Sequence, residues 1–168
     1  MISRFLRNFA ALLHHTRMSA PPAETCPAEI SLHLAAFDAL PFPIFVVTAD
    51  LYIEDFNDAA SRLPDEVLLA AIRTDPENER IGDLLHCIDS SPGCGNSPAC
   101  QNCGLVRSVR EAAAGKTCRS VTTIRVRKQG CFVPIEFLTT AAPVDAGREP
   151  LVLLVLEDKA NWSPYRGA

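Results

Sequence analysis

Hydrophobic and polar positions alternate along the second half of the chain, which predicts β-strands. From Thr122 to Val126 every second residue is Thr or β-branched aliphatic, and the intervening positions include Arg125. This period of two suits a strand with one buried and one solvated face. The predicted strands of this half cover 119–127, 131–141 and 151–157. The sequence Lys-Gln-Gly after the first strand predicts a tight hairpin turn.

The first half of the chain predicts two more strands and several helices. The run IFVVT is β-branched and aromatic, and Asn57 can cap the short helix that follows the second strand. The predicted strands cover 44–48 and 51–56, and the predicted helices cover 29–40, 58–62, 65–73 and 105–114. Gly115 closes the last helix. Strands on both sides of a helical block indicate an α+β fold with an antiparallel sheet of about five strands.

The helices are expected on one face of this sheet, with the Cys-rich loop outside it. The sheet residues expected to meet the core are Ile44, Val46, Ile53, Phe56, Val133, Ile135, Leu153 and Val155.

Four cysteines lie in the stretch HCIDSSPGCGNSPACQNCG, at positions 86–104, with the spacing C-x6-C-x5-C-x2-C. They are Cys87, Cys94, Cys100 and Cys103. This stretch is rich in Gly, Pro, Ser and Asn and has little apolar surface, so burial alone does not order it. Thiolates converging on a metal or an iron–sulfur cluster would hold such a loop, because thiolates are soft ligands. These four residues are therefore the predicted metal and cofactor ligands.

The ligand itself stays open between three interpretations. Structural zinc usually uses two tight C-x2-C pairs, and here only Cys100 and Cys103 form one. Iron–sulfur ligation accepts mixed spacings, and backbone N–H groups of a Gly-rich loop can bond to cluster sulfurs. An iron–sulfur cluster is preferred, with 4Fe–4S favoured over 2Fe–2S; the alternatives are zinc and a thiol–disulfide switch or no ligand. Cys118 and Cys131 are expected to be small strand residues, Cys26 to be exposed, and His86 to lie beside the ligands.

Composition narrows the function classes. A net charge of −4 argues against direct binding of nucleic acid. No apolar run is long enough for a transmembrane helix. Seven cysteines without a clear signal peptide indicate a reduced, cytoplasmic protein with ligand or redox cysteines. Phosphate-binding, zinc-protease and nucleophile-elbow motifs do not occur, so no enzymatic activity and no catalytic residue are predicted.

The ends of the chain are set apart from the predicted domain. Residues 1–28 form an amphipathic and then Pro-rich extension, expected to be poorly ordered, and the native start is either Met1 or Met18. The domain is expected to cover 29–158, followed by a tail at 159–168.

The order of elements, with the residues that carry it, resembles a PAS domain. The segment ALPFPIFVVTADLYIEDFNDAASRL is similar to the PAS entry strands followed by an Asn-x-Ala pair, here Asn57 and Ala59. IGDLL at 81–85 resembles the Gly-bearing segment before the last PAS helix, and LVLLVLED at 151–158 resembles the final strand. The resemblance implies a sensory module, and PAS-like modules commonly pair through the flanking helix, here 29–40.

A bacterial subset of PAS modules, some attached to sensor kinases, carries a similar cysteine insert. Its pattern, G-D-L-x-x-C followed by G-C-G-x-S-x-x-C-x-x-C, matches this chain from Gly82 to Cys103. The resemblance implies sensing or signal relay and does not by itself fix the ligand. The leading hypothesis is a cytoplasmic sensor whose four-cysteine loop holds a redox- or gas-sensitive iron–sulfur cluster. Such a sensor would act on a separate protein such as a sensor kinase or regulator, with a homodimer expected. The alternative is a PAS module that binds a small molecule and holds structural zinc at the four cysteines. An enzyme with a reactive thiol is the least supported class, because no His–carboxylate pair is placed to activate one.

Overall fold

The computed structural model describes residues 33, 35–61, 63, 79–128, 131–145 and 149–159. The predicted helix at 65–73, the N-terminal extension and the tail beyond residue 159 lie outside these residues. Five strands are described: β1 (Ile44–Thr48), β2 (Ile53–Phe56), β3 (Cys118–Lys128), β4 (Cys131–Val144) and β5 (Leu151–Asp158). The helical elements are α3 (Asp58–Ser61), α5 (Ile81–Leu84), the 3-10 helix η2 (Pro98–Asn102) and α6 (Gly104–Ala113).

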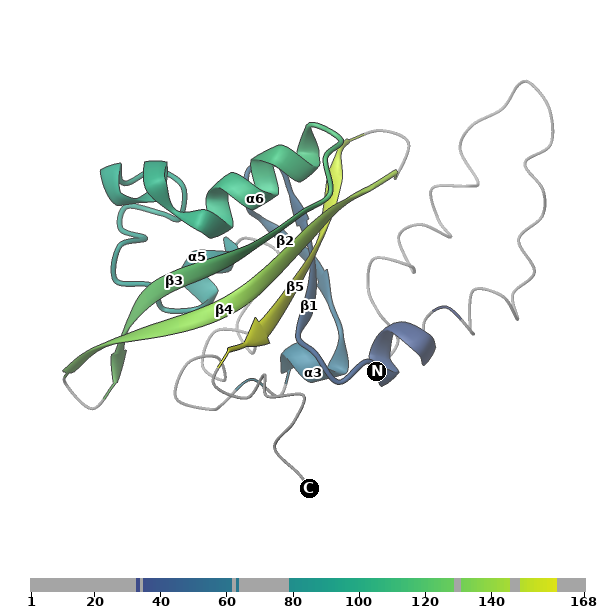
Figure 1. Cartoon of the computed structure of the whole chain (residues 1–168), viewed down its shortest axis with the longest axis horizontal. Helices are drawn as coiled ribbons and strands as arrows, with labels where there is room; N and C mark the ends of the chain where they lie inside the picture. The colour runs from purple at the N-terminus through teal and green to yellow at the C-terminus, as the bar shows by residue number, and fades with distance from the viewer. Residues whose placement is uncertain are drawn as a thin grey trace.

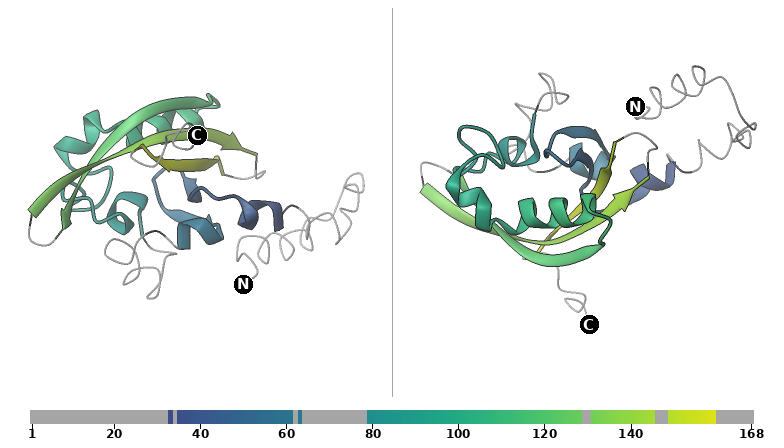
Figure 2. Two further views of the ribbon diagram at one scale, coloured as in Figure 1. Left: turned by 60° about the horizontal axis from the view of Figure 1, so that its bottom comes forward. Right: turned by 90° about the horizontal axis from the view of Figure 1, so that it is seen from above.

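The strands form one antiparallel sheet in the order β2-β1-β5-β4-β3. The predicted α+β fold with a five-stranded antiparallel sheet is therefore confirmed. α6 lies along one face of the sheet, and α5 and the cysteine loop lie on the same side (Figures 1 and 2). β1 and β5, the first and the last strand along the chain, pair inside the sheet, with Phe45 opposite Leu154.

The residues predicted to meet the core in β1, β4 and β5 are buried to different extents. The main core cluster includes Phe45, Val47, Leu154 and Leu156. Ile44 is buried as predicted, although it lies outside that cluster. The expected Val46 is likewise buried outside it, and Leu153, Val155 and Val133 are half-buried. Both faces of β1 and β5 are apolar, so the period of two identifies the strand but not its inner face. The predictions for Ile53, Phe56 and Ile135 hold, the last two as partly buried residues packed on the core.

Strand β3 follows the predicted alternation. Thr122, Ile124 and Val126 are buried, and the residues between them are exposed. α6 packs over this strand with Leu105, Val106 and further buried residues on its inner face. Part of the contact is polar, because the hydroxyls of Ser108 and Ser120 lie 3.0 Å apart and the Cys118 thiol donates to the Ser108 carbonyl at 3.3 Å.

Asn57 joins the N-terminal flank to the first hairpin. Its side-chain oxygen accepts hydrogen bonds from the N–H groups of Ile44 and Ala60, each at 3.0 Å. The bond to Ala60 confirms the predicted cap of α3. Its amide nitrogen donates to the carbonyls of Phe37, Leu40 and Phe42. One buried side chain therefore fixes the segment before β1 against the turn after β2.

Within the residues described, no helix is long and apolar enough to cross a membrane.

Candidate functional site

The cysteine loop begins on the outer edge of β3. Cys87 forms an isolated antiparallel bridge with Val126, and the N–H of Ile88 donates to the Arg125 carbonyl at 2.8 Å. Since β3 is an edge strand of the sheet, these bonds satisfy backbone groups that would otherwise face solvent. The first predicted ligand is thus held directly against the sheet.

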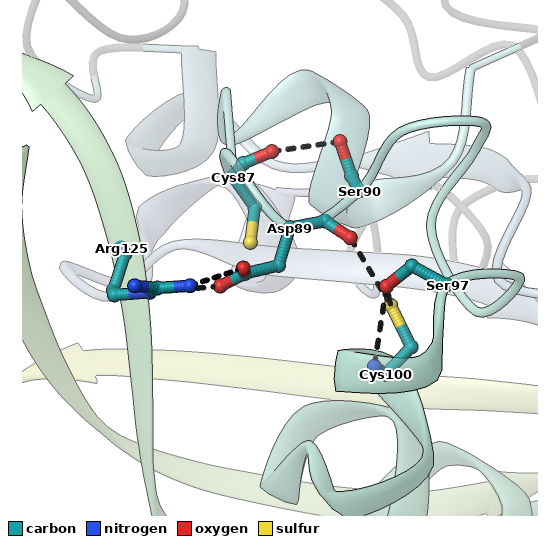
Figure 3. Close-up of polar contacts among 6 residues, drawn as sticks. All are labelled: Cys87, Asp89, Ser90, Ser97, Cys100 and Arg125. Carbon is teal, nitrogen blue, oxygen red and sulfur yellow. Dashed lines mark hydrogen bonds and ion pairs between the residues drawn. The ribbon is translucent and has the colours of Figure 1, made fainter.

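A charged pair reinforces this attachment. Asp89 in the loop accepts two hydrogen bonds from the Arg125 guanidinium on β3, one from Nε at 3.1 Å and one from Nη2 (Figure 3). Such a two-point pair fixes the orientation of both side chains. Asp89 also lines the cavity described below, so Arg125 contacts a residue of that cavity from the sheet side.

Cys94 packs directly against Gly82, and two charged side chains form hydrogen bonds with its backbone. A Cβ atom on Gly82 would lie 2.4 Å from the Cys94 Sγ, so only glycine leaves room for this thiol. The Asp83 carboxylate accepts from the Cys94 N–H at 3.1 Å, and Arg80 Nη1 donates to the Cys94 carbonyl at 2.9 Å. The Arg80 guanidinium in turn lies 4.7 Å from the centre of the Tyr52 ring.

The last two cysteines flank a short, capped 3-10 helix. Ser97 caps η2 by accepting from the Cys100 N–H at 3.3 Å, and its hydroxyl donates to the Cys100 Sγ at 3.2 Å. Figure 3 shows Ser97 and Cys100 facing the loop segment that carries Asp89 and Ser90. Cys103 is the N-cap residue of α6, so the fourth predicted ligand is continuous with the helix that covers the sheet.

All four predicted ligands line one cavity of about 150 Å³. That is well above the roughly 10–15 Å³ that a cavity needs to hold one water. Its lining also includes Gly82 and Asp89, and Leu105 of α6. Cys118, Cys131 and His86 do not line it, and Cys26 lies outside the described residues. Among those residues, no three His, Cys, Asp or Glu side chains are grouped so as to hold a single metal ion.

Burial disfavours the thiolate form at two of these positions. Desolvation raises the pKa of Cys94 to about 12, with smaller contributions from the neighbouring Cys100, Asp83 and Cys103. Desolvation also raises the pKa of Cys87, although backbone hydrogen bonds oppose it. Several thiolates in one cavity repel one another unless a cation neutralises them. A positively charged, thiophilic group bound among these sulfurs would favour their thiolate forms.

Sequence reasoning missed the residues that position the cysteines. The motif included Gly82 and Asp83 but gave neither a role, and Arg125 was assigned to a solvated sheet face. No local pattern reports the Asp89–Arg125 pair, because the two residues are 36 positions apart. The only available signal was Asp89 itself, the single charged residue within a stretch that is otherwise neutral from Leu85 to Gly104.

Comparisons with known proteins identify the fold. No family model matches the chain. No curated protein sequence matches it either. One similar solved structure is a domain of the sensory box sensor histidine kinase/response regulator from Geobacter sulfurreducens. It matches with a TM-score of 0.50 and 18% sequence identity, and the match covers 82% of this chain and 100% of that one. A PAS domain from a two-component sensor histidine kinase also matches with a TM-score of 0.50, at 11% identity, covering 80% of this chain and 100% of that one. The five-stranded antiparallel sheet and its flanking helices are therefore a PAS-like fold.

Proposed function

We propose that this protein is a PAS-type sensor whose four-cysteine cavity binds an iron–sulfur cluster and relays its state to a separate protein. The observation that carries the proposal is that Cys87, Cys94, Cys100 and Cys103 line one cavity of about 150 Å³. A cavity of this size has room for a group larger than one ion. Cysteine thiolates are the usual ligands of iron–sulfur clusters.

Cys87, Cys94, Cys100 and Cys103 would be the ligands, and a bound cluster would supply electron transfer or sensitivity to oxidants and gases. The chain's own residues position those ligands. Gly82 makes room for Cys94, Ser97 donates to the Cys100 sulfur, and Asp83 fixes the backbone of Cys94. Hydrogen bonds to ligand sulfurs also tune the potential of such sites.

Two connections support a relay from the cavity to the rest of the domain. At one end, Cys87 and Asp89 are bonded to β3 through Val126 and Arg125. At the other end, Cys103 begins α6, which packs on β3 partly through polar groups. Release of the loop on oxidation or loss of the cluster would free the N-terminus of α6. The helix would then shift against the sheet, a local change that biases a two-state element.

The output would be a contact with another chain, either a second copy or a sensor kinase or regulator. The segment before β1 supports pairing, because Leu40 and Phe42 are 44% and 42% exposed while their carbonyls are bonded to Asn57. Exposed apolar side chains that are rigidly held favour a protein interface. In this proposal the protein itself has no enzymatic activity.

Single cysteine substitutions test the proposal. The chain is purified without oxygen, and iron, acid-labile sulfide and zinc are measured for Cys94→Ser and Cys103→Ser, with Cys131→Ser as the matched control. We expect the first two variants to lose most iron and sulfide and the control to retain them. Equal iron and sulfide in all three variants would exclude the four-ligand site. Zinc in place of iron would favour the alternative of a structural zinc.

A further inference from the structure

The exposed face of α6 carries a second cavity, outside the cysteine site. It has a volume of about 260 Å³ and is lined by Gln101, Arg107, Arg110, Glu111, Ala114 and Lys116. All six residues are exposed. We call this cavity the α6 hollow.

The α6 hollow is cationic in a chain that is acidic overall. Three of its residues are basic and one is acidic, whereas the whole chain has a net charge of −4. Arg107 and Glu111 face each other at 4.0 Å, and both are largely exposed, so they neutralise each other only weakly. Within the described part of the chain, Arg110 and Lys116 are paired with no carboxylate. The positive charge is therefore available to a partner.

Backbone geometry places these cations in an extended row. Arg107, Arg110 and Ala114 follow the i, i+3, i+7 spacing of one helix face. Gly115, with a φ of +89°, ends the helix, and the N–H of Lys116 then donates to the Glu111 carbonyl at 3.0 Å. A helix rises about 1.5 Å per residue, so the row spans roughly 10 Å or more. A compact anion such as phosphate cannot reach both ends of this row, whereas an extended peptide can, since its alternate residues are about 6.6 Å apart.

We propose that the α6 hollow is a docking site for an acidic peptide segment of another protein. Charge complementarity selects Asp- and Glu-rich sequences, and only three cations are too few for a duplex nucleic acid on an acidic protein. Gln101 joins the hollow to the cysteine site, because it lies in η2 between Cys100 and Cys103. This link to signalling rests on the proposed function, but peptide binding itself does not.

The probe is a fluorescein-labelled peptide of five Glu-Gly repeats, and its binding to the full chain is followed by fluorescence anisotropy at about 20 mM salt. We expect Arg110→Glu and Lys116→Glu each to weaken binding by about fivefold or more, and about 150 mM salt to weaken binding to the unaltered chain. Arg127→Glu is the matched control, because it makes the same charge change on the β3–β4 hairpin, where Arg127 lies over the Phe132 ring. Its affinity should stay within about twofold of that of the unaltered chain.

Three results would overturn the proposal. They are unchanged affinity in Lys116→Glu, an equal loss in Arg127→Glu, and tighter binding of a DNA duplex than of the peptide. Lys116 lies beyond the end of α6, so its substitution keeps the test valid even if Arg110→Glu disturbs the helix. Iron is measured on the same samples, so that failure of peptide docking and failure of the proposed cluster are separate observations.

Discussion

The thiol of Cys94 lies directly over the backbone of Gly82, at a place where a Cβ would be 2.4 Å from the sulfur. Gly82 belongs to α5 and Cys94 to the loop, so this contact fixes how closely the loop approaches the helix. Both residues are buried. The position of one predicted ligand is therefore set by the absence of a side chain on another element.

Gly82→Ala should displace Cys94 and loosen the centre. A methyl group forced into this contact is expected to destabilise the fold by about 1–3 kcal/mol and to lower the iron content of protein purified without oxygen. Thermal unfolding and iron analysis measure the two effects. Gly115→Ala is the control, since its φ of +89° disfavours alanine but no atom lies within 4 Å of the added Cβ. The control should lose stability and keep its iron; equal iron in both variants would contradict the role of Gly82.

Arg125→Ala should detach the start of the loop from β3 without removing a ligand. The Asp89–Arg125 pair is largely exposed on the arginine side, so its loss should lower the stability of the fold only slightly. Hydrogen exchange should instead rise at residues 87–90, because the pair holds this segment on the strand. Arg127→Ala, two residues along the same face, is the control. Unchanged exchange at 87–90 in Arg125→Ala would show that backbone bonds alone hold the loop.

The cysteines of the metal-free protein should differ in their reactivity toward iodoacetamide. Only the thiolate reacts, and burial raises the pKa of Cys94 to about 12, so this residue is protonated at pH 8. Cys131 is exposed and should be alkylated first. Mass spectrometry of timed samples measures the order. Alkylation of Cys94 as fast as that of Cys131 would contradict the buried position of Cys94.

The same pKa shift predicts how the stability of the metal-free protein depends on pH. Because the pKa of folded Cys94 lies above the unfolded value, the unfolded chain loses its proton first as pH rises. The stabilising contribution is therefore complete below pH 9.0 and is lost between pH 9.0 and about 12. Urea unfolding between pH 8 and pH 11 should show a fall in stability, and Cys94→Ala should flatten that fall. If the stability of Cys94→Ala falls by the same amount over this pH range, other titrating groups cause the fall and the prediction is wrong.

Thr139→Val should stabilise the domain. Thr139 is fully buried in β4, and its hydroxyl has no hydrogen-bond partner among the described residues. Valine has a similar shape and removes the unsatisfied polar atom, so a gain of about 1 kcal/mol is expected. Thr117→Val, at an exposed position just before β3, serves as the control and should change the unfolding midpoint little. A lower midpoint for Thr139→Val would indicate that the hydroxyl has a partner.

The sequence predicted the strands well because strand patterns are local. β1 occupies the predicted 44–48, and the last three strands differ from their predicted ranges by no more than three residues at either end. The inner face of β1 and β5 was not predictable in this way, because apolar residues occupy both faces and only the elements packed on the sheet decide between them. The convergence of four cysteines on one centre stays a prediction from their spacing. The four residues line one cavity, but among the described residues no three of them are grouped so as to hold a single metal ion. The contacts that place them, such as Asp89 with Arg125, join distant segments and leave no local pattern.

The most direct test of the account is the metal and sulfide content of the unaltered chain purified without oxygen. We predict a brown protein that contains iron and acid-labile sulfide in similar amounts, with visible absorbance that bleaches on reduction with dithionite. A colourless protein with one zinc per chain, or with no metal while all four cysteines remain reduced, would contradict the account.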